Sequence, residues 1–177
     1  MVGLLGRFDE VKGQRELIRA VAQARLAPGG QRLRLMLAGF ETATTQAEVR
    51  GWIDAAGLGE ATTITGQRPD VAAVISAMDL GVVASKWSET IARAALEIMS
   101  CGRPLVGTSV GVMPDLLGPE ALLPPADVPA LARAVARAAT DPGHLRALAA
   151  AQARTIATLS GRDFLERTLA VYAGGRP

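Results

Sequence analysis

Short apolar segments alternate along this chain with longer segments in which hydrophobic residues recur every three or four positions. The short segments predict strands buried on both faces, and the longer ones predict amphipathic helices. The expected strands are 2–5, 33–38, 62–65, 80–84, 105–107 and 121–123. The expected helices are 14–25, 46–56, 70–78 and 90–100, with a short one after Met113-Pro114. This order predicts an α/β fold: a Rossmann-like, doubly wound parallel sheet of about six strands.

The pattern changes after Pro124-Pro125, where the sequence becomes rich in Ala and Arg with helical periodicity. Extra C-terminal helices are expected at about 128–140, 143–159 and 162–173. Each has an apolar face, which in the last helix includes Leu165, Leu169 and Tyr172. Because such a face needs cover, we expect these helices to close one side of the sheet. By length, all 177 residues form one domain.

Composition and charge narrow the classes of function. The chain has 19 basic and 17 acidic residues, without a like-charge run or basic-aromatic interleaving, which disfavours nucleic acid as a partner. The single cysteine, Cys101, excludes an internal disulfide and fits a reducing compartment, so a cytoplasmic location is expected. We expect its thiol to be packed rather than reactive. With one His and one Cys, no metal-ligand cluster is predicted.

The loops at the carboxyl edge of the predicted sheet are where a ligand is expected. The first, residues 6–13, is flanked by glycine and offers one guanidinium, Arg7, and one ammonium, Lys12. An Arg can grip a diphosphate as a fork and a Lys as a point charge. The alternative is that both are solvated charges whose partners are Asp9 and Glu10, and this loop alone leaves both interpretations open.

The helix expected at 90–100 opens directly after a strand and carries Glu89 before it and Glu97 within it. Its first N–H groups and partial positive charge suit an anion. The helix is apolar nearly all round, so we expect it to be buried, with its carboxylates reading a ligand or paired. The alternative is an exposed helix in which Arg93 pairs with both glutamates. Eight positions span about 12 Å of helix, too far for two acids to act on one bond, so the glutamates would contact different parts of an extended ligand.

Three motifs together carry a resemblance to a known family. They are Gly6-Arg7 followed by five residues and Gly13, the spacing from Glu89 to Glu97, and the segment Cys-Gly-Arg-Pro-Leu-Val-Gly-Thr at 101–108. In this order they resemble the C-terminal, donor-binding domain of retaining GT-B glycosyltransferases of family four, glycosyl transferases group 1. The resemblance covers nearly the whole chain.

The resemblance implies a role for each matching residue. Gly6, Arg7 and Lys12 would bind the diphosphate of a nucleotide sugar. Glu97 would bond the ribose hydroxyls, and Glu89 would lie beside the donor sugar, which makes Arg7, Lys12 and Glu89 the candidate catalytic residues. Backbone amides around Thr90 and Ile91 would contact the phosphates. Gln67 and Arg68, in the third loop of this edge, would hold the nucleobase.

The resemblance also implies the reaction. The donor would be a UDP-, GDP- or ADP-sugar, with no cofactor and no metal ion, and transfer would need an N-terminal acceptor-binding domain that these residues do not include. We therefore expect the chain alone to bind nucleotide without transferring sugar, and any membrane association to come from the missing part. Alternatives are half of a nucleotide-sugar epimerase, a non-catalytic nucleotide-binding module, or a domain whose charges are structural.

The chain departs from the family pattern at one point. Many relatives have Gly-Phe-Gly where this chain has Thr90-Ile91-Ala92, and the loss of glycine limits how closely a ligand approaches the backbone.

Overall fold

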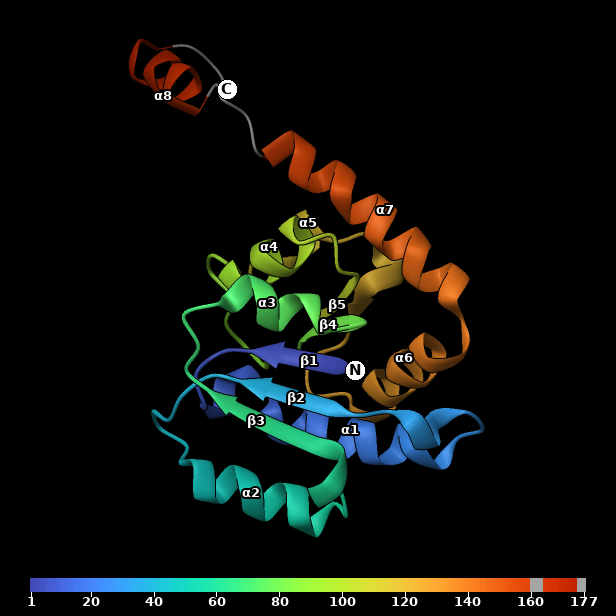
Figure 1. Cartoon of the computed structure of the whole chain (residues 1–177). Helices are drawn as coiled ribbons and strands as arrows, with labels where there is room; N and C mark the ends of the chain where they lie inside the picture. Colours follow the sequence, from blue (N-terminus) through green and yellow to red (C-terminus); the bar gives the residue numbers. More distant parts are fainter. Residues whose placement is uncertain (160–163, 175–177) are drawn as a thin grey trace.

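The computed structural model describes residues 1–159 and 164–174, and within them one parallel sheet is flanked by helices (Figure 1). The strands are β1 (Val2–Leu5), β2 (Leu35–Ala38), β3 (Thr62–Gly66), β4 (Leu80–Val83), β5 (Leu105–Thr108) and β6 (Leu122–Leu123). The helices are α1 (Gln14–Leu26), α2 (Gln46–Ala55), α3 (Val71–Ser76), α4 (Arg93–Ser100), α5 (Met113–Leu116), α6 (Val128–Thr140), α7 (Pro142–Leu159) and α8 (Phe164–Tyr172). Short 3₁₀ turns, among them η1 (Glu10–Lys12), connect several of these elements.

The strand order is β3-β2-β1-β4-β5-β6, with every neighbouring pair parallel. The chain steps outward from β1 to β3 on one side, then returns to place β4 against the other side of β1. This reversal is the switch point at which doubly wound sheets leave a crevice at the carboxyl ends of their strands. The predicted Rossmann-like α/β fold is confirmed.

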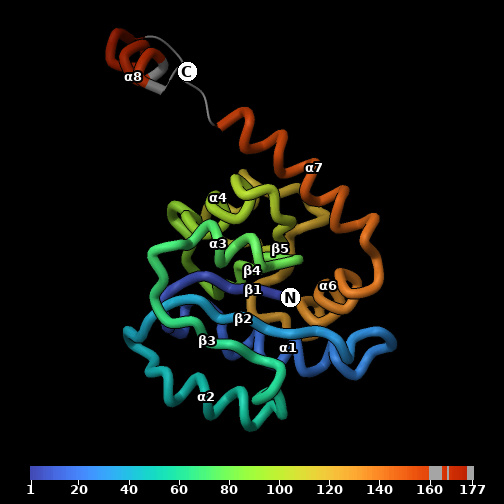
Figure 2. The backbone as a smooth tube through the Cα atoms, viewed as in Figure 1, coloured from blue at the N-terminus to red at the C-terminus, as the bar shows by residue number. Residues whose placement is uncertain are grey.

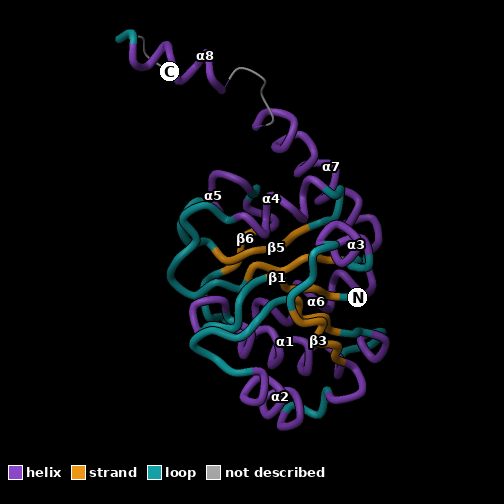
Figure 3. The backbone as a smooth tube through the Cα atoms, turned by 60° about the vertical axis from the view of Figure 1, so that its left-hand side comes forward, coloured by secondary structure: helices purple, strands orange, loops and turns teal. Residues whose placement is uncertain are grey.

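Helices cover both faces of the sheet, with α1 and α2 on one face and α3 and α4 on the other (Figures 1 and 3). On the first face α1 packs against α6, and on the second α4 packs against α7. The central strands therefore have no solvent face, and their side chains form the core, including Leu4, Leu35, Leu37, Leu80 and Leu105. This is why apolar runs without alternation predicted them correctly.

The strand predictions hold to within two residues, but the helix predicted at 90–100 begins three residues later, at Arg93. Ala92, before its first residue, has φ 51° and ψ 43°, the left-handed conformation, which cannot belong to a right-handed helix. The segment before Ala92 makes a tertiary contact. The carbonyl of Glu89 accepts a hydrogen bond from the backbone N–H of Val112 at 2.9 Å, which holds this segment against the loop after β5 before the chain turns into α4.

The C-terminal helices divide into two that pack and one that does not. In α7 the buried Gln152 accepts from the backbone N–H of Leu105 at 2.9 Å and donates to its carbonyl at 2.7 Å, which ties this helix to the start of β5. The expectation that the last helix also covers the sheet is wrong for α8, where Leu165, Leu169 and Tyr172 are 65%, 57% and 86% exposed. The 18 residues of α7 carry the chain beyond the sheet, and α8 lies apart from it (Figure 2). Residues 162–163 of the predicted helix lie outside the described part.

Two further observations bear on the predictions from composition. Cys101 is exposed rather than packed, because it follows the last turn of α4 at the surface. Among the described residues no helix has the length and apolar character needed to cross a membrane.

Candidate functional site

A cleft of about 870 Å³ opens at the carboxyl edge of the sheet. It is bounded by the loops that follow β1, β2, β3 and β4 and by the first two turns of α4. The structure places all nine predicted site residues around this cleft: Gly6, Arg7, Lys12, Gln67, Arg68, Glu89, Thr90, Ile91 and Glu97. Residues separated by 91 positions of sequence, from Gly6 to Glu97, therefore share one cavity, while the ligand that they bind stays a prediction.

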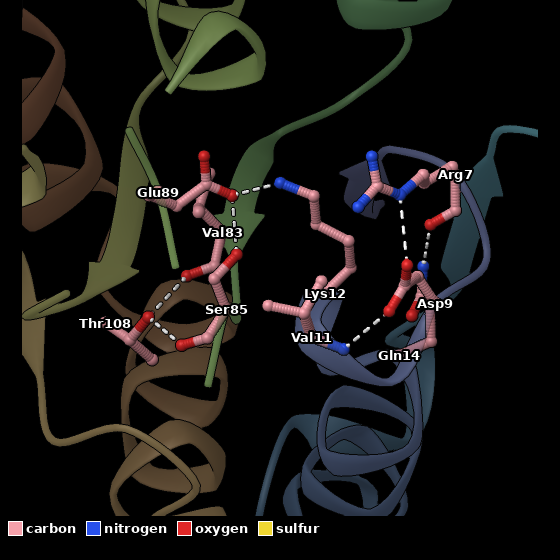
Figure 4. Close-up of polar contacts among 9 residues, drawn as sticks. All are labelled: Arg7, Asp9, Val11, Lys12, Gln14, Val83, Ser85, Glu89 and Thr108. Carbon is pink, nitrogen blue, oxygen red and sulfur yellow. Dashed lines mark hydrogen bonds and ion pairs between the residues drawn. The ribbon is translucent and has the colours of Figure 1, made fainter. Parts of the chain in front are cut away.

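The first loop holds Arg7 at both its backbone and its side chain (Figure 4). The buried Gln14 donates from Nε2 to the carbonyl of Arg7 at 2.7 Å, and Arg7 donates from Nε to Oδ2 of Asp9 at 3.1 Å. The other carboxylate oxygen of Asp9 accepts from the backbone N–H of Val11 at 3.0 Å and so caps η1. This N–H, and then the Arg7 guanidinium, hold the pKa of Asp9 below its usual value. Arg7 keeps both Nη groups free of partners in the described chain, and its side chain is half exposed toward the cleft.

Lys12 turns toward the loop after β4 rather than toward its neighbours in sequence. Its Nζ donates to Oε1 of Glu89, while Glu10 pairs with Lys86 at 2.8 Å. In the alternative interpretation the charges of this loop pair with each other. Within residues 6–13, the structure shows one such pair, between Arg7 and Asp9. The two candidate cations thus differ: Arg7 is available in the open cleft, and Lys12 is shared with a carboxylate.

Glu89 is nearly buried, with 8% of the residue exposed, and lies in the loop before α4. Its Oε1 also accepts from Oγ of Ser85 at 2.6 Å, whereas its Oε2 has no hydrogen-bond partner in the described part of the chain (Figure 4). Sequence reasoning missed Ser85, because a single serine after a strand carries no local signal of the carboxylate it will meet.

The entry to α4 is open to the cleft, contrary to the expected burial. Ile91 is 66% exposed, and the backbone N–H groups of Thr90 and Ile91 have no partner in residues 1–159 and 164–174. Arg93 forms no ion pair with Glu89 or Glu97 within the described residues, so the exposed-helix alternative is not seen either. The segment therefore presents free N–H donors ahead of the helix, as an anion site requires.

The second turn of α4 and the loop after β3 also line the cleft. Glu97 is half-buried and has no side-chain partner among the described residues. Arg68 binds both oxygens of Asp70, at 2.8 and 2.6 Å, which fixes its guanidinium plane and holds the pKa of Asp70 below its usual value. Gln67 beside it is exposed. The cleft lining thus also includes a carboxylate without a partner in the described residues and a fixed planar cation.

Two glycines let loops at the carboxyl edge of the sheet approach each other backbone to backbone. Gly13 has φ +70°, and a Cβ built on it would lie 2.0 Å from the carbonyl oxygen of Ala84. Gly111 has φ +54°, and its Cβ would lie 2.0 Å from the carbonyl oxygen of Glu89. Both positions need glycine for conformation and for space.

Residues 1–141 match the model of the family glycosyl transferases group 1. The chain belongs to this family. Among curated relatives in the family, it is 34% identical over 177 residues to the 2-deoxystreptamine N-acetyl-D-glucosaminyltransferase of Streptomyces fradiae, which covers 97% of this chain and 41% of the relative. The chain thus spans about two fifths of the length of this relative.

Solved structures support the same fold. Anabaena HepE in complex with UDP is 26% identical, with a TM-score of 0.83 over 96% of this chain and 48% of that one. The C-terminal domain of a glycosyl transferase group 1 family protein from Francisella tularensis, at 20% identity, has a TM-score of 0.78 over 89% of this chain and 84% of that one. The second comparison shows that this fold corresponds to a C-terminal domain there.

Proposed function

We propose that the cleft binds a nucleoside-diphosphate sugar and that this chain, as one domain together with an N-terminal acceptor-binding domain, transfers the glycosyl group to an acceptor with retention of configuration. The observation that carries the proposal is the convergence of Arg7, Lys12 and the free N–H groups of Thr90 and Ile91 on one cleft of a group 1 family member. HepE, at 26% identity, has been crystallised with UDP and with UDP-glucose, which favours a uridine nucleotide here.

The diphosphate fits the positively charged part of the cleft. When the bond between sugar and nucleotide breaks, negative charge grows on the leaving phosphate. The free Nη groups of Arg7, with Lys12 and the amides before α4, are donors for that charge. Such charge-assisted bonds contribute about 1.5–3 kcal/mol each when desolvated, but about 0–1 kcal/mol when solvated. Since Arg7 is half exposed in this domain, closure by a second domain is part of the proposal.

The remaining residues divide the rest of the donor between them. Glu97 would accept the ribose hydroxyls, Glu89 would face the sugar through its free Oε2, and Gln67 with Arg68 would border the base. Gly6 would bring the backbone of the first loop close to the phosphates. These roles follow from the family resemblance and are supported by the place of each residue in the cleft.

Calorimetric titration with UDP, GDP and ADP tests the proposal. We expect UDP to bind weakly, and Arg7→Ala and Lys12→Ala each to weaken it by up to about fivefold, because each removes a charge-assisted bond that contributes at most about 1 kcal/mol while the cleft is open to solvent. Arg146→Ala, an exposed residue of α7, is the control for net charge and should change nothing. The clamp assignment is wrong if no nucleotide binds at millimolar concentration, or if all three variants bind as the parent does.

The ribose assignment has its own test. Glu97→Ala should weaken UDP more than inorganic pyrophosphate, since only UDP carries the hydroxyls that this carboxylate would accept. Equal losses for the two ligands would remove the ribose role.

Metal independence and cytoplasmic location belong to the proposal as well. In the described chain, no three His, Cys, Asp or Glu side chains are grouped closely enough to hold a metal ion. The expectation of metal-free binding rests on the family resemblance: UDP titrations should give the same affinity with and without a chelator, and a clear loss on chelation would refute metal-free binding. Fractionation of cells expressing the full-length protein tests the location.

A further inference from the structure

We infer that Ser85 is a positioning residue for Glu89. Its hydroxyl fixes one carboxylate oxygen, Oε1, so that the other, Oε2, faces the donor sugar. This inference rests on the proposed function of the cleft.

The contact between Ser85 and Glu89 is short and dry. Ser85 is 1% exposed, and its Oγ donates to Oε1 at 2.6 Å. A hydroxyl bonded to a carboxylate is roughly twice as strong a contact as a neutral pair, and burial excludes the water that would compete for it. Because Lys12 donates to the same oxygen, both protein donors act on Oε1, and none in the described residues acts on Oε2. The arrangement selects one orientation of the carboxylate (Figure 4).

Ser85 is itself fixed to the sheet by Thr108. The pairing between β4 and β5 ends at Val83 and Gly107, so Ser85 lies beyond the part of β4 that is paired with β5, while Thr108 pairs with Leu123 of β6. Thr108, 4% exposed, continues the link: its Oγ1 donates to the carbonyl of Ser85 at 2.5 Å, with a longer contact of 3.5 Å to that of Val83. Ser85 therefore takes its position from the sheet and not from the loop alone.

The backbone of Glu89 is held independently of its side chain. Its carbonyl accepts from the N–H of Val112 at 2.9 Å, and Gly111 packs directly against it. With the backbone fixed in this way, the remaining freedom of Glu89 lies in its side-chain torsions, and Ser85 and Lys12 are the groups that restrict them.

The two donors on Oε1 are not equivalent once a ligand binds. Lys12 is also a candidate donor to the diphosphate, so a bound nucleotide competes with Glu89 for its ammonium. Ser85 carries no charge, and within the described residues its hydroxyl donates to Glu89 alone. Removing this hydroxyl should therefore affect recognition of the sugar while leaving recognition of the diphosphate intact.

The experiment titrates the full chain with UDP and with UDP-glucose and measures the ratio of the two dissociation constants, Kd(UDP-glucose)/Kd(UDP). For Ser85→Ala we expect the ratio to rise roughly tenfold, the effect of one lost bond to a charged group, while UDP affinity stays within about twofold. Thr108→Val should raise the ratio in the same direction, and Thr108→Ser, which keeps the hydroxyl, should restore it. Arg7→Ala should weaken both ligands equally and leave the ratio unchanged.

A double variant separates positioning from general packing. Glu89→Gln should raise the ratio by itself, and adding Ser85→Ala to it should raise the ratio little further, because the serine acts through the carboxylate. Fully additive effects would overturn the inference, as would a Ser85→Ala variant that weakens UDP and UDP-glucose by the same factor. If Ser85→Ala fails to fold, the ratio measured for Thr108→Val decides between the same two outcomes. Failure of the parent chain to bind UDP would instead refute the proposed function itself.

Discussion

Gly13 joins two loops of the cleft through a contact that no larger residue can make. With φ +70°, it lies so close to the segment after β4 that a Cβ would stand 2.0 Å from the carbonyl oxygen of Ala84 and 2.9 Å from its carbon. Both atoms belong to backbone and cannot rotate away. The N–H of Lys86 donates to the carbonyl of Val11 at 2.8 Å across the same junction, so Gly13→Ala should force the loop of Lys12 away from the loop of Glu89.

The expected loss of stability has two sources. A left-handed alanine costs about 1–2 kcal/mol, of which about 0.4–1 kcal/mol is offset because alanine restricts the unfolded chain. Forcing a packed backbone to shift costs about 1–3 kcal/mol more. We expect Gly13→Ala to lose about 2–4 kcal/mol, which lowers Tm by about 4–16 °C in a chain of this size.

Gly57 provides a matched control. Its φ is +67°, and a Cβ built on it would meet nothing within 4 Å. In Gly57→Ala the alanine would adopt the strained left-handed conformation but would not collide with other atoms. Its free energy of unfolding should therefore fall by about 1 kcal/mol or less.

Thermal unfolding of both variants, followed by UDP titration, measures the contact between the two loops. Gly57→Ala should bind UDP as the parent does, whereas Gly13→Ala should bind it more weakly, since Lys12 and Glu89 move apart. Equal losses of Tm in the two variants would show that the junction at Ala84 contributes nothing, and the account of how the cleft is held together would be wrong.

Two further predictions concern groups that support the cleft and the sheet. Asp9→Ala should cost about 0.5–2 kcal/mol in urea unfolding through loss of the cap on η1, while Asp9→Asn, which keeps an acceptor for the N–H of Val11, should cost less. The pKa of Asp9 is lower in the folded chain than its ordinary value of 3.8. The ionised Asp9 side chain therefore stabilises the fold fully at pH values above 3.8, and this stabilisation is lost as the pH falls through the lower pKa of the folded state. The difference in free energy of unfolding between the parent and Asp9→Ala should therefore shrink only below pH 3.8. A difference that has already disappeared at pH 6 would contradict this reasoning. Gln152→Ala leaves the N–H and carbonyl of Leu105 without their side-chain partners and should cost about 2–4 kcal/mol with unchanged UDP affinity; a Tm within 1 °C of the parent would argue against the tie between α7 and β5.

The fold could be predicted from the sequence because strands that are buried on both faces of a sheet consist of continuous apolar residues, which are easy to recognise. Residues 80–83 are all apolar or glycine, all buried in β4, and flanked by segments with helical period. The predicted boundaries failed where tertiary contacts decide the conformation. Alanine is the best helix former, so nothing local indicates that Ala92 adopts a left-handed conformation, whereas the segment just before it is held by the hydrogen bond from Val112 to Glu89, two residues 23 positions apart.

The candidate site was predictable as a set of residues but not as a network. Motif spacing brought Lys12 and Glu89 to the same cleft, yet their ion pair joins residues 77 positions apart, and neither motif encodes it. The apolar face of α8 shows a related limit. Periodicity correctly predicts a helix there, but it does not identify what the face of Leu165 and Leu169 packs against, and these side chains are exposed in the described chain.

The ion pair between Lys12 and Glu89 makes the two predicted roles depend on each other. Without ligand, Lys12 neutralises a nearly buried carboxylate, which keeps the loop before α4 in place. In the proposed complex, a nucleoside diphosphate competes with Glu89 for the ammonium of Lys12. It offers no hydroxyl of a donor sugar to Oε2, so the weakened ion pair of Glu89 is not replaced by another contact. An intact donor supplies both, with phosphate oxygens for Lys12 and sugar hydroxyls for Glu89. The shared lysine therefore favours the complete donor over the spent nucleotide, in a cleft whose first loop provides only two cations for the phosphates.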